Sequence, residues 1–218
     1  MEAKKFITLM IGILIPLTIS AQYHTVSSFQ QVFGYENGGG YIKGDTTKSK
    51  IALQRLERRY IKKLEKKFRY EGWKFPHTVC LGLDEEIRTI RTYAYMKDED
   101  GKAVYQLASC SVYGANYDEA YEKAFSLANN YLEMDINKYL TSKYGNMEPI
   151  NIKIEKDLKN GRLSSFIRRN DKEKKHIAVD ILARIYRHID NDKTEAMASL
   201  MVKMEDIEKF VEETSSLK

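Results

Sequence analysis

The stretch AVYQLASCSVYGANYDEAYEKAFSLANNYLEMDINKYLTSKY, residues 103–144, decides the fold of this chain. Residues 103–113 are rich in side chains that favour β-structure, which predicts a strand. Asp118 is a suitable N-cap, and the residues after it predict a helix that ends near Tyr144, just before Gly145. A strand followed directly by a long, one-sided helix indicates an α+β domain. The apolar face of this helix carries Ala120, Ala124, Leu127, Ala128, Tyr131 and Leu132.

Two further helices are predicted upstream of this stretch. The first covers residues 50–71 and ends at Gly72, because glycine is common just beyond a helix. The second is shorter and covers residues 84–95. A turn follows it, which the composition predicts at residues 97–102, KDEDGK. Apolar residues recur at three- and four-residue steps along the first helix, at Leu53, Leu56, Tyr60, Leu64 and Phe68.

Downstream, residues 177–189 fit two periodicities, because their apolar residues alternate as in a strand and also match a helix stripe. The β-branched content, and a four-residue turn at 190–193 before a second short run at 194–202, favour a β-hairpin. A short acidic helix at 204–213 closes the domain. We therefore expect an antiparallel sheet of about four strands, with one face covered by both the long alanine-spaced helix and the N-terminal basic helix.

The N-terminus has the three parts of an export signal. A basic flank at Lys4 and Lys5 precedes an apolar run that ends at Ile19-Ser20-Ala21. The alternative is a retained membrane anchor, but the run contains a proline and is shorter than the roughly 20 apolar residues that a spanning helix needs. No cysteine occupies the cut site, so a lipid anchor is not indicated. We expect a signal peptide at 1–21, a flexible Gly-rich leader at 22–49 and one α+β domain at 50–218.

Residues 84–143 resemble a unit of the twenty-kilodalton bacterial outer-membrane lipoprotein family. The resemblance rests on the turn at 98–101, on a strand that runs to Gly114, and on alanines at four-residue steps in the helix that follows. The hairpin from Tyr186 to Met201 fits more loosely. This chain lacks the lipid-accepting cysteine, so it resembles a non-lipidated exported relative. The resemblance implies an envelope protein of a Gram-negative bacterium, in the periplasm or at the outer membrane or cell surface, and it supplies no catalytic residues.

The helix at residues 50–69 is strongly basic. Residues 48–69 hold ten basic and two acidic residues, a local excess larger than the net charge of +5 of the whole chain. Like charges lie four residues apart in four places, for example Arg58 with Lys62, and each such pair costs about 0.2 to 0.5 kcal/mol. The candidate anion-binding residues are Arg55, Arg58, Arg59, Lys62, Lys63, Lys66 and Lys67.

Three interpretations explain what offsets this repulsion. The first is salt screening together with contact to the acidic C-terminal segment, residues 205–213. The second is an anionic envelope partner, such as lipid head groups or an acidic protein surface. The third is nucleic acid, which export from the cytoplasm and the lack of a recognised nucleic-acid module argue against.

The chain has two cysteines, Cys80 and Cys110, both in the exported part. An oxidising compartment would permit a disulfide between them, and the closed loop would contribute about 3 to 4 kcal/mol in the chain-entropy model. The alternative is that both remain thiols, with Cys110 a small apolar strand residue and Cys80 a partly buried loop residue. The sequence leaves both possibilities open.

No residue pattern in the sequence is typical of catalysis, of a metal site or of a cofactor. The four histidines, at positions 24, 77, 176 and 188, are scattered without a second ligand at helix or hairpin spacing. Six tyrosines concentrate between residues 93 and 121, which favours sheet packing. If a ligand site exists, we expect it at the tyrosine-rich strand edge beside Trp73.

These observations predict a non-enzymatic, exported envelope module that binds or assembles with another envelope component. Two alternatives stay open. One is an enzyme whose active site has no sequence signature, and the other is peripheral attachment to an anionic surface through residues 50–69. The sequence does not indicate an oligomeric state.

Overall fold

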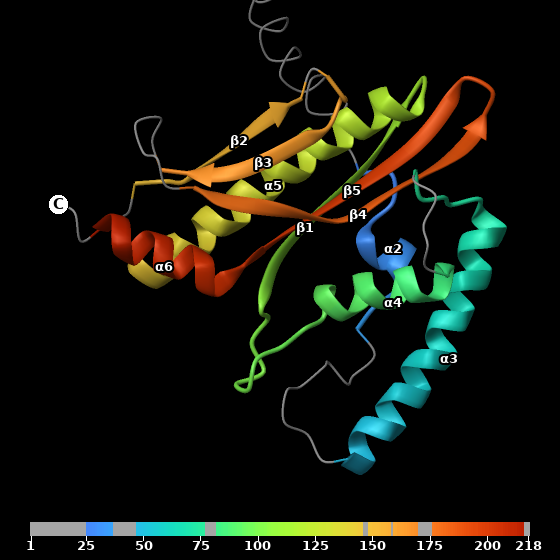
Figure 1. Ribbon diagram of the computed structural model, residues 1–218, viewed down its shortest axis with the longest axis horizontal. Helices are drawn as coiled ribbons and strands as arrows, with labels where there is room; N and C mark the ends of the chain where they lie inside the picture. Colours follow the sequence, from blue (N-terminus) through green and yellow to red (C-terminus); the bar gives the residue numbers. More distant parts are fainter. Residues whose placement is uncertain are drawn as a thin grey trace, which may run out of the picture.

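The protein is an α+β structure in which an antiparallel sheet curls around one long helix (Figure 1). The computed structural model describes residues 25–36, 47–76, 82–145, 148–157, 159–169 and 176–215. The strand order in the sheet is β1-β5-β4-β3-β2. The strands are β1 (Tyr105–Gly114), β2 (Asn151–Lys156), β3 (Leu163–Arg168), β4 (Ile177–Asp190) and β5 (Lys193–Lys203). The described helices are α2 (Phe29–Phe33), α3 (Thr47–Glu71), α4 (Leu83–Ala94), α5 (Tyr117–Tyr144) and α6 (Met204–Ser215).

Strand β1 is an edge strand of the sheet, and β5 is its neighbour. They pair in one unbroken register from Tyr105 opposite Lys203 to Gly114 opposite Thr194. Side chains alternate across a sheet, so Cys110 and Ala198 face one side while Ser111 and Met197 face the other. Residues 194–200 of β5 are all buried, which requires a cover on both faces of the sheet.

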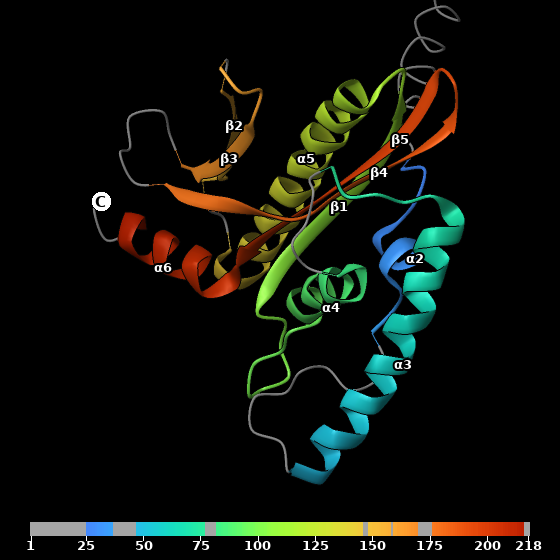
Figure 2. The ribbon, with the colours of Figure 1, turned by 45° about the vertical axis from the view of Figure 1, so that its right-hand side comes forward.

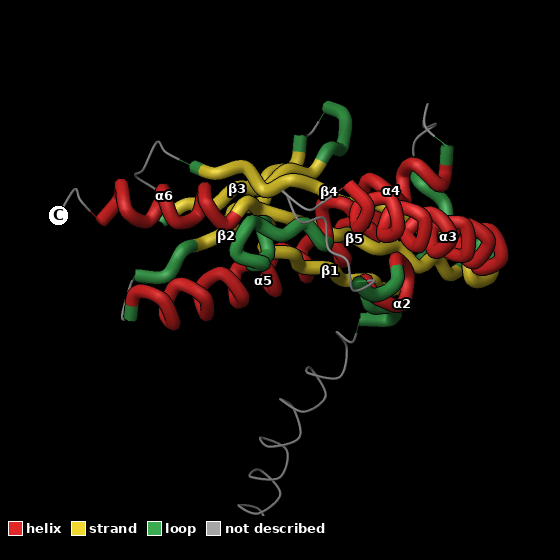
Figure 3. Tube along the Cα trace, turned by 90° about the horizontal axis from the view of Figure 1, so that it is seen from below, coloured by secondary structure: helices red, strands yellow, loops and turns green. Residues whose placement is uncertain are grey.

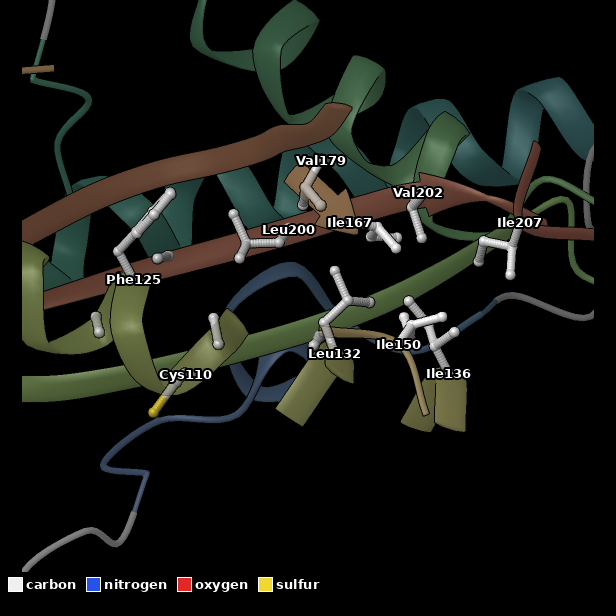
Figure 4. Close-up of a cluster of buried hydrophobic side chains, with 14 of the residues drawn as sticks. Cys110, Phe125, Leu132, Ile136, Ile150, Ile167, Val179, Leu200, Val202 and Ile207 are labelled. Carbon is white, nitrogen blue, oxygen red and sulfur yellow. The ribbon is translucent and has the colours of Figure 1, made fainter. Parts of the chain in front are cut away.

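One cover is helix α5, together with α6. Ala120, Ala124 and Ala128 of α5 are fully buried, and their small side chains let the helix lie close to the sheet. Gly114 ends β1 directly against this helix, because a Cβ there would lie 2.6 Å from the backbone nitrogen of Ala120. Figure 4 shows the apolar residues between α5 and the strands, among them Leu132. We call helices α5 and α6 and these side chains the α5 layer.

The other cover consists of α2, α3 and α4, which we call the α3 layer. Phe33, Phe68 and Ile87 from the three helices are fully buried with Ile185 and Met197 of the sheet. The expectation that the alanine-spaced helix and the basic helix share one face is therefore wrong. They lie on opposite faces, because Met197 and Ala198 of β5 point in opposite directions and each needs a cover.

The expected loose leader is also wrong for residues 28–34. Ser28 caps helix α2 through a capping box with Gln31. Phe29, Val32 and Phe33 are buried in the α3 layer. The glycines at 38, 39, 40 and 44 and the expected signal peptide at 1–21 lie outside the described residues.

Most of the other expected elements are present. The helices at 50–71, 84–95 and 204–213 and the turn at 97–102 are confirmed, and residues 177–189 form a strand of the expected hairpin. The sheet has five strands rather than about four, because the pairing of β2 with β3 was not predicted. Helix α5 begins two residues earlier than expected. Its N-cap is Asn116, which accepts a hydrogen bond from the Glu119 backbone, whereas Asp118 lies in the first turn.

Candidate functional site: the basic face of helix α3

Helix α3 has one side in the protein core and one side in solvent. Ile61, Leu64 and Phe68 recur at three- and four-residue steps and are buried against α2, α4 and the sheet. The opposite side is cationic and exposed. Its members are Arg55, Arg58, Arg59, Lys62, Lys63 and Lys66, which we call the basic face.

The basic face has no acidic partner among the residues that the structure describes. Two other basic residues of α3 behave differently. Lys67 donates a hydrogen bond to the Gln31 carbonyl and lies 3.7 Å from Glu71, while Arg69 pairs with Glu65 at 2.9 Å. Six of the seven predicted anion-binding residues are therefore gathered on one surface, and Lys67 instead fastens α2 to α3.

The acidic C-terminal segment does not neutralise this surface. Helix α6 lies at the opposite end of the molecule from α3 in every view (Figures 1, 2 and 3). Glu205 pairs with Lys203 and Lys209, and their ammonium groups lower the pKa of Glu205 to about 2. Glu208 accepts hydrogen bonds from Lys143 and Tyr139 of α5. The interpretation that this segment offsets the charge of α3 is wrong, because the fold separates the two helices.

A buried arginine of α4 fixes the position of α3. The Arg91 side chain is almost fully buried, and its guanidinium binds both carboxylate oxygens of Glu57, at 2.5 and 3.1 Å. It also donates to the carbonyls of Phe33 and Tyr35, at 2.6 and 3.2 Å. One side chain therefore joins α4 to α3 and to the segment after α2.

Two tyrosine rings complete this clamp. Tyr60 and Tyr95 lie 4.7 and 5.2 Å from the Arg91 guanidinium carbon, a geometry that favours cation–π attraction. The Tyr95 hydroxyl donates to the Gly34 carbonyl, and burial raises the pKa of Tyr95 to about 12. Gly34 has a φ of +79°, and Tyr60 fills the space where a Cβ would project. The clamp is not predicted from the sequence, although Arg91 lies on the same helix stripe as Ile87 and Ile90.

A second polar anchor lies farther along the same face of the sheet. Glu195 of β5 is fully buried and accepts hydrogen bonds from Arg187, at 2.8 Å, and from Ser111, at 3.0 Å. The Arg187 guanidinium lies over the ring of Trp73, 4.6 Å from its centre. Trp73 is itself buried just after α3, so this anchor holds the C-terminal end of the helix.

The tyrosines do not form one site beside Trp73. Tyr93 and Tyr105 pack against each other, with ring centres 5.7 Å apart. Tyr117 and Tyr121 instead enclose Arg184 on the α5 side of the sheet. These tyrosines therefore take part in separate packing contacts and do not gather at one strand edge.

The cysteines and the metal-ligand residues add no second site. Cys110 is buried under α5, and burial raises the pKa of its thiol, while Cys80 lies outside the described residues. The bridge between them stays a prediction. Within the described ranges, no three histidine, cysteine, aspartate or glutamate side chains lie close enough together to hold a metal ion. None of the helices described is both long and apolar enough to cross a bilayer.

Comparisons with known proteins give no assignment. No family model, no curated protein and no solved structure matches this chain. The resemblance to the outer-membrane lipoprotein family therefore stays a prediction.

Proposed function

We propose that this protein is an exported, non-enzymatic envelope module that attaches to an anionic surface through the basic face of α3. The observation that carries the proposal is the set of six exposed cations on one side of α3, none paired with a described acid. Exposed charges of one sign repel each other, and an anionic partner removes that cost. The signal-like pattern at residues 1–21 supports the envelope location.

The expected strength of this attachment is moderate and depends on salt. A basic residue next to an anionic membrane contributes about 1 kcal/mol, so six of them are enough for reversible attachment. Exposed charges are screened beyond roughly 8 Å at physiological ionic strength. Retention on an anionic surface should therefore fall steeply as salt rises.

The Arg91 clamp supports the proposal by making the surface rigid. Arg91 binds Glu57 on the inner side of α3, within the same turns that carry Arg55, Arg58 and Arg59 outside. A helix held in this way does not have to be ordered when it binds, which lowers the entropic cost of association.

The resemblance to the outer-membrane lipoprotein family gives a further reason to expect attachment to the envelope. The chain resembles a family whose members are fixed to the outer membrane by a lipidated cysteine, and it has no cysteine at the expected cut site. A basic surface offers a reversible route to the same envelope.

The test is a charge reversal with a matched control. Reversing four cations of the basic face should abolish retention on anionic vesicles at low salt, since the local excess of positive charge disappears. The fold should survive, because the reversed charges at positions 62 and 63 would lie four residues before Lys66 and Lys67, where opposite charges attract. The test variant is R58E/R59E/K62E/K63E. The control carries the same change of charge at exposed positions far from α3 and is K123E/K138E/K159E/R162E.

Purified proteins would be floated with vesicles of phosphatidylglycerol and phosphatidylcholine across a sodium chloride series. The intact protein and the control variant should float and be released by salt, and the α3 variant should stay behind. Equal retention of both variants, or retention that salt does not change, would refute the proposal.

A further inference from the structure

Two large apolar side chains stand exposed on the outer side of α3, among the cations. Leu56 is 58 % exposed and Tyr70 is 93 % exposed. Both lie seven residues from Lys63, on either side of it in the sequence. Seven residues make almost two full helical turns, so Leu56, Lys63 and Tyr70 form one line along the helix. We call these three residues the apolar line.

The apolar line borders the basic face along its length. Arg59 and Lys66 lie three residues after Leu56 and Lys63, so they project beside the line. The ends of the line are fourteen residues apart, which corresponds to about 21 Å along the axis. An array of this length, with a leucine near one end and a tyrosine near the other, fits a flat partner better than a small ligand.

We propose that the anionic surface is a phospholipid bilayer, and that Leu56 and Tyr70 insert into its interface while the basic face contacts the head groups. This inference rests on the proposed function and specifies its partner. Tyrosine prefers the membrane interface, because its ring is apolar and its hydroxyl stays near water. Lysine and arginine stems lie along the interface while their charges reach the phosphates.

The depth of insertion is limited because the main apolar side of α3 is already buried in the protein core. An interfacial amphipathic helix usually buries its apolar side in the lipid, but Ile61, Leu64 and Phe68 of α3 are committed to the protein core. Among the α3 side chains that the structure describes, those of residues 55–71, the large apolar ones exposed toward a membrane are Leu56 and Tyr70. Attachment is therefore shallow, led by charge and strengthened by two side chains.

An acidic protein or a polysaccharide would satisfy the basic face equally well but would gain little from these two side chains. Burying a leucine in an apolar medium is favourable, because apolar surface is removed from water. Replacement of Leu56 and Tyr70 by serine therefore separates a bilayer from a polyanion that has no apolar interior.

The first experiment compares L56S/Y70S with the control M134S/I189S, which removes two exposed apolar side chains outside α3. L56S/Y70S should bind phosphatidylglycerol vesicles at least tenfold more weakly than the intact protein, since 1.4 kcal/mol corresponds to a factor of ten. Its retention on heparin, which offers charge alone, should be unchanged. The control should match the intact protein on both.

The second experiment reports insertion directly. A tryptophan at position 70 (Y70W) should be quenched by lipids brominated on their acyl chains, while one at the exposed position 134 of α5 (M134W) should not. The native Trp73 is buried and contributes the same background to both variants.

The outcomes separate the two proposals. Salt-sensitive vesicle binding that is unaffected by L56S/Y70S, with no quenching at position 70, overturns insertion and leaves the basic attachment standing. Heparin retention without vesicle binding also overturns the bilayer. No binding to either overturns both.

Discussion

The two layers that cover the sheet are held in different ways. The α5 layer is packed mainly by apolar side chains, many of them alanine, between α5 and the strands. The α3 layer combines an aromatic core with buried charged groups, namely Arg91 with Glu57 and Arg187 with Glu195. The difference shows that apolar side chains at helical spacing set which side of each helix faces the sheet, and that buried ion pairs add a second restraint on the position of α3. Helix α3 is the one that carries the basic face.

The largest expected effect breaks the α3 layer. Arg91→Met leaves Glu57 without the guanidinium in a mostly buried site and removes the donor to the carbonyls of Phe33 and Tyr35. Loss of one partner of a buried ion pair costs about 3 to 5 kcal/mol. Urea unfolding measures the effect. The matched control is Arg88→Met, one turn earlier, whose 3.9 Å pair with Asp84 is exposed and worth less than about 1 kcal/mol.

Hydrogen exchange would show where Arg91→Met acts. Amides of α2 and α3 should exchange faster while those of α5 keep their protection, because the α5 layer does not depend on the clamp. Equal loss of protection in both layers would contradict the division drawn between them.

A smaller effect is expected in the α5 layer. Leu132→Ala removes a fully buried side chain between α5 and the strands (Figure 4) and should lower the free energy of unfolding by about 3 kcal/mol, through lost burial and the cavity left behind. Met134→Ala, two residues away and mostly exposed, should change it by less than about 0.5 kcal/mol. Similar losses in both variants would mean that α5 does not pack as described.

The start of α5 gives a third, finer comparison. Asn116→Ala removes the side chain that accepts a hydrogen bond from the Glu119 backbone at 3.0 Å, and should cost about 1 kcal/mol. Asp118→Ala removes only an acid from the first turn, which is worth a few tenths of a kcal/mol to about 1 at most. Thermal unfolding of the two variants ranks them. A larger loss of stability for Asp118→Ala than for Asn116→Ala would mean that Asp118 is the N-cap of α5.

The smallest effect is confined to alkaline solution. Burial raises the pKa of Tyr95 to about 12, from about 10 in the unfolded chain. Between these values the unfolded state loses its proton first, so stability is complete below pH 10 and falls as the pH rises toward 12. Intact protein should therefore lose more stability than Tyr95→Phe between pH 9 and 11 in urea titrations. Equal losses of stability in the intact protein and in Tyr95→Phe would show that folding does not raise the pKa of Tyr95.

The sequence predicts the α5 layer well and the α3 layer poorly, for a physical reason. Ala120, Ala124 and Ala128 mark a buried helix face by spacing alone, since periodicity reports which side avoids water. Arg91 gives no comparable signal, because a charged residue on an apolar stripe is buried only when the fold brings it a partner. Glu57, its partner, lies thirty-four residues away.

Two missed elements did carry readable signals. Ser28 and Gln31 have the spacing of a capping box, and Phe29, Val32 and Phe33 supply the apolar residues of α2. In β2, Ile152 and Ile154 alternate with charged residues, as in an edge strand with one side toward a core. The glycine-rich composition around α2 and the shortness of β2 concealed both.

The candidate site was predictable in its residues but not in its environment. Counting charges along the sequence identifies the cations of α3 and shows that their local excess is larger than the net charge of the whole chain. It does not show that Lys67 turns toward Gln31, or that Glu205 and Glu208 are engaged by lysines at the far end of the molecule. Those facts depend on which faces of the sheet the helices occupy.

The most direct test of the attachment through α3 is lysine footprinting on the unmodified protein. Acetylation with a water-soluble reagent, followed by mass spectrometry, would compare the protein alone with the protein on phosphatidylglycerol vesicles. The proposed attachment predicts protection of Lys62, Lys63 and Lys66, with Lys138 and Lys159 as reactive as before. Protection of Lys138 or Lys159 while Lys62, Lys63 and Lys66 stay reactive would contradict it.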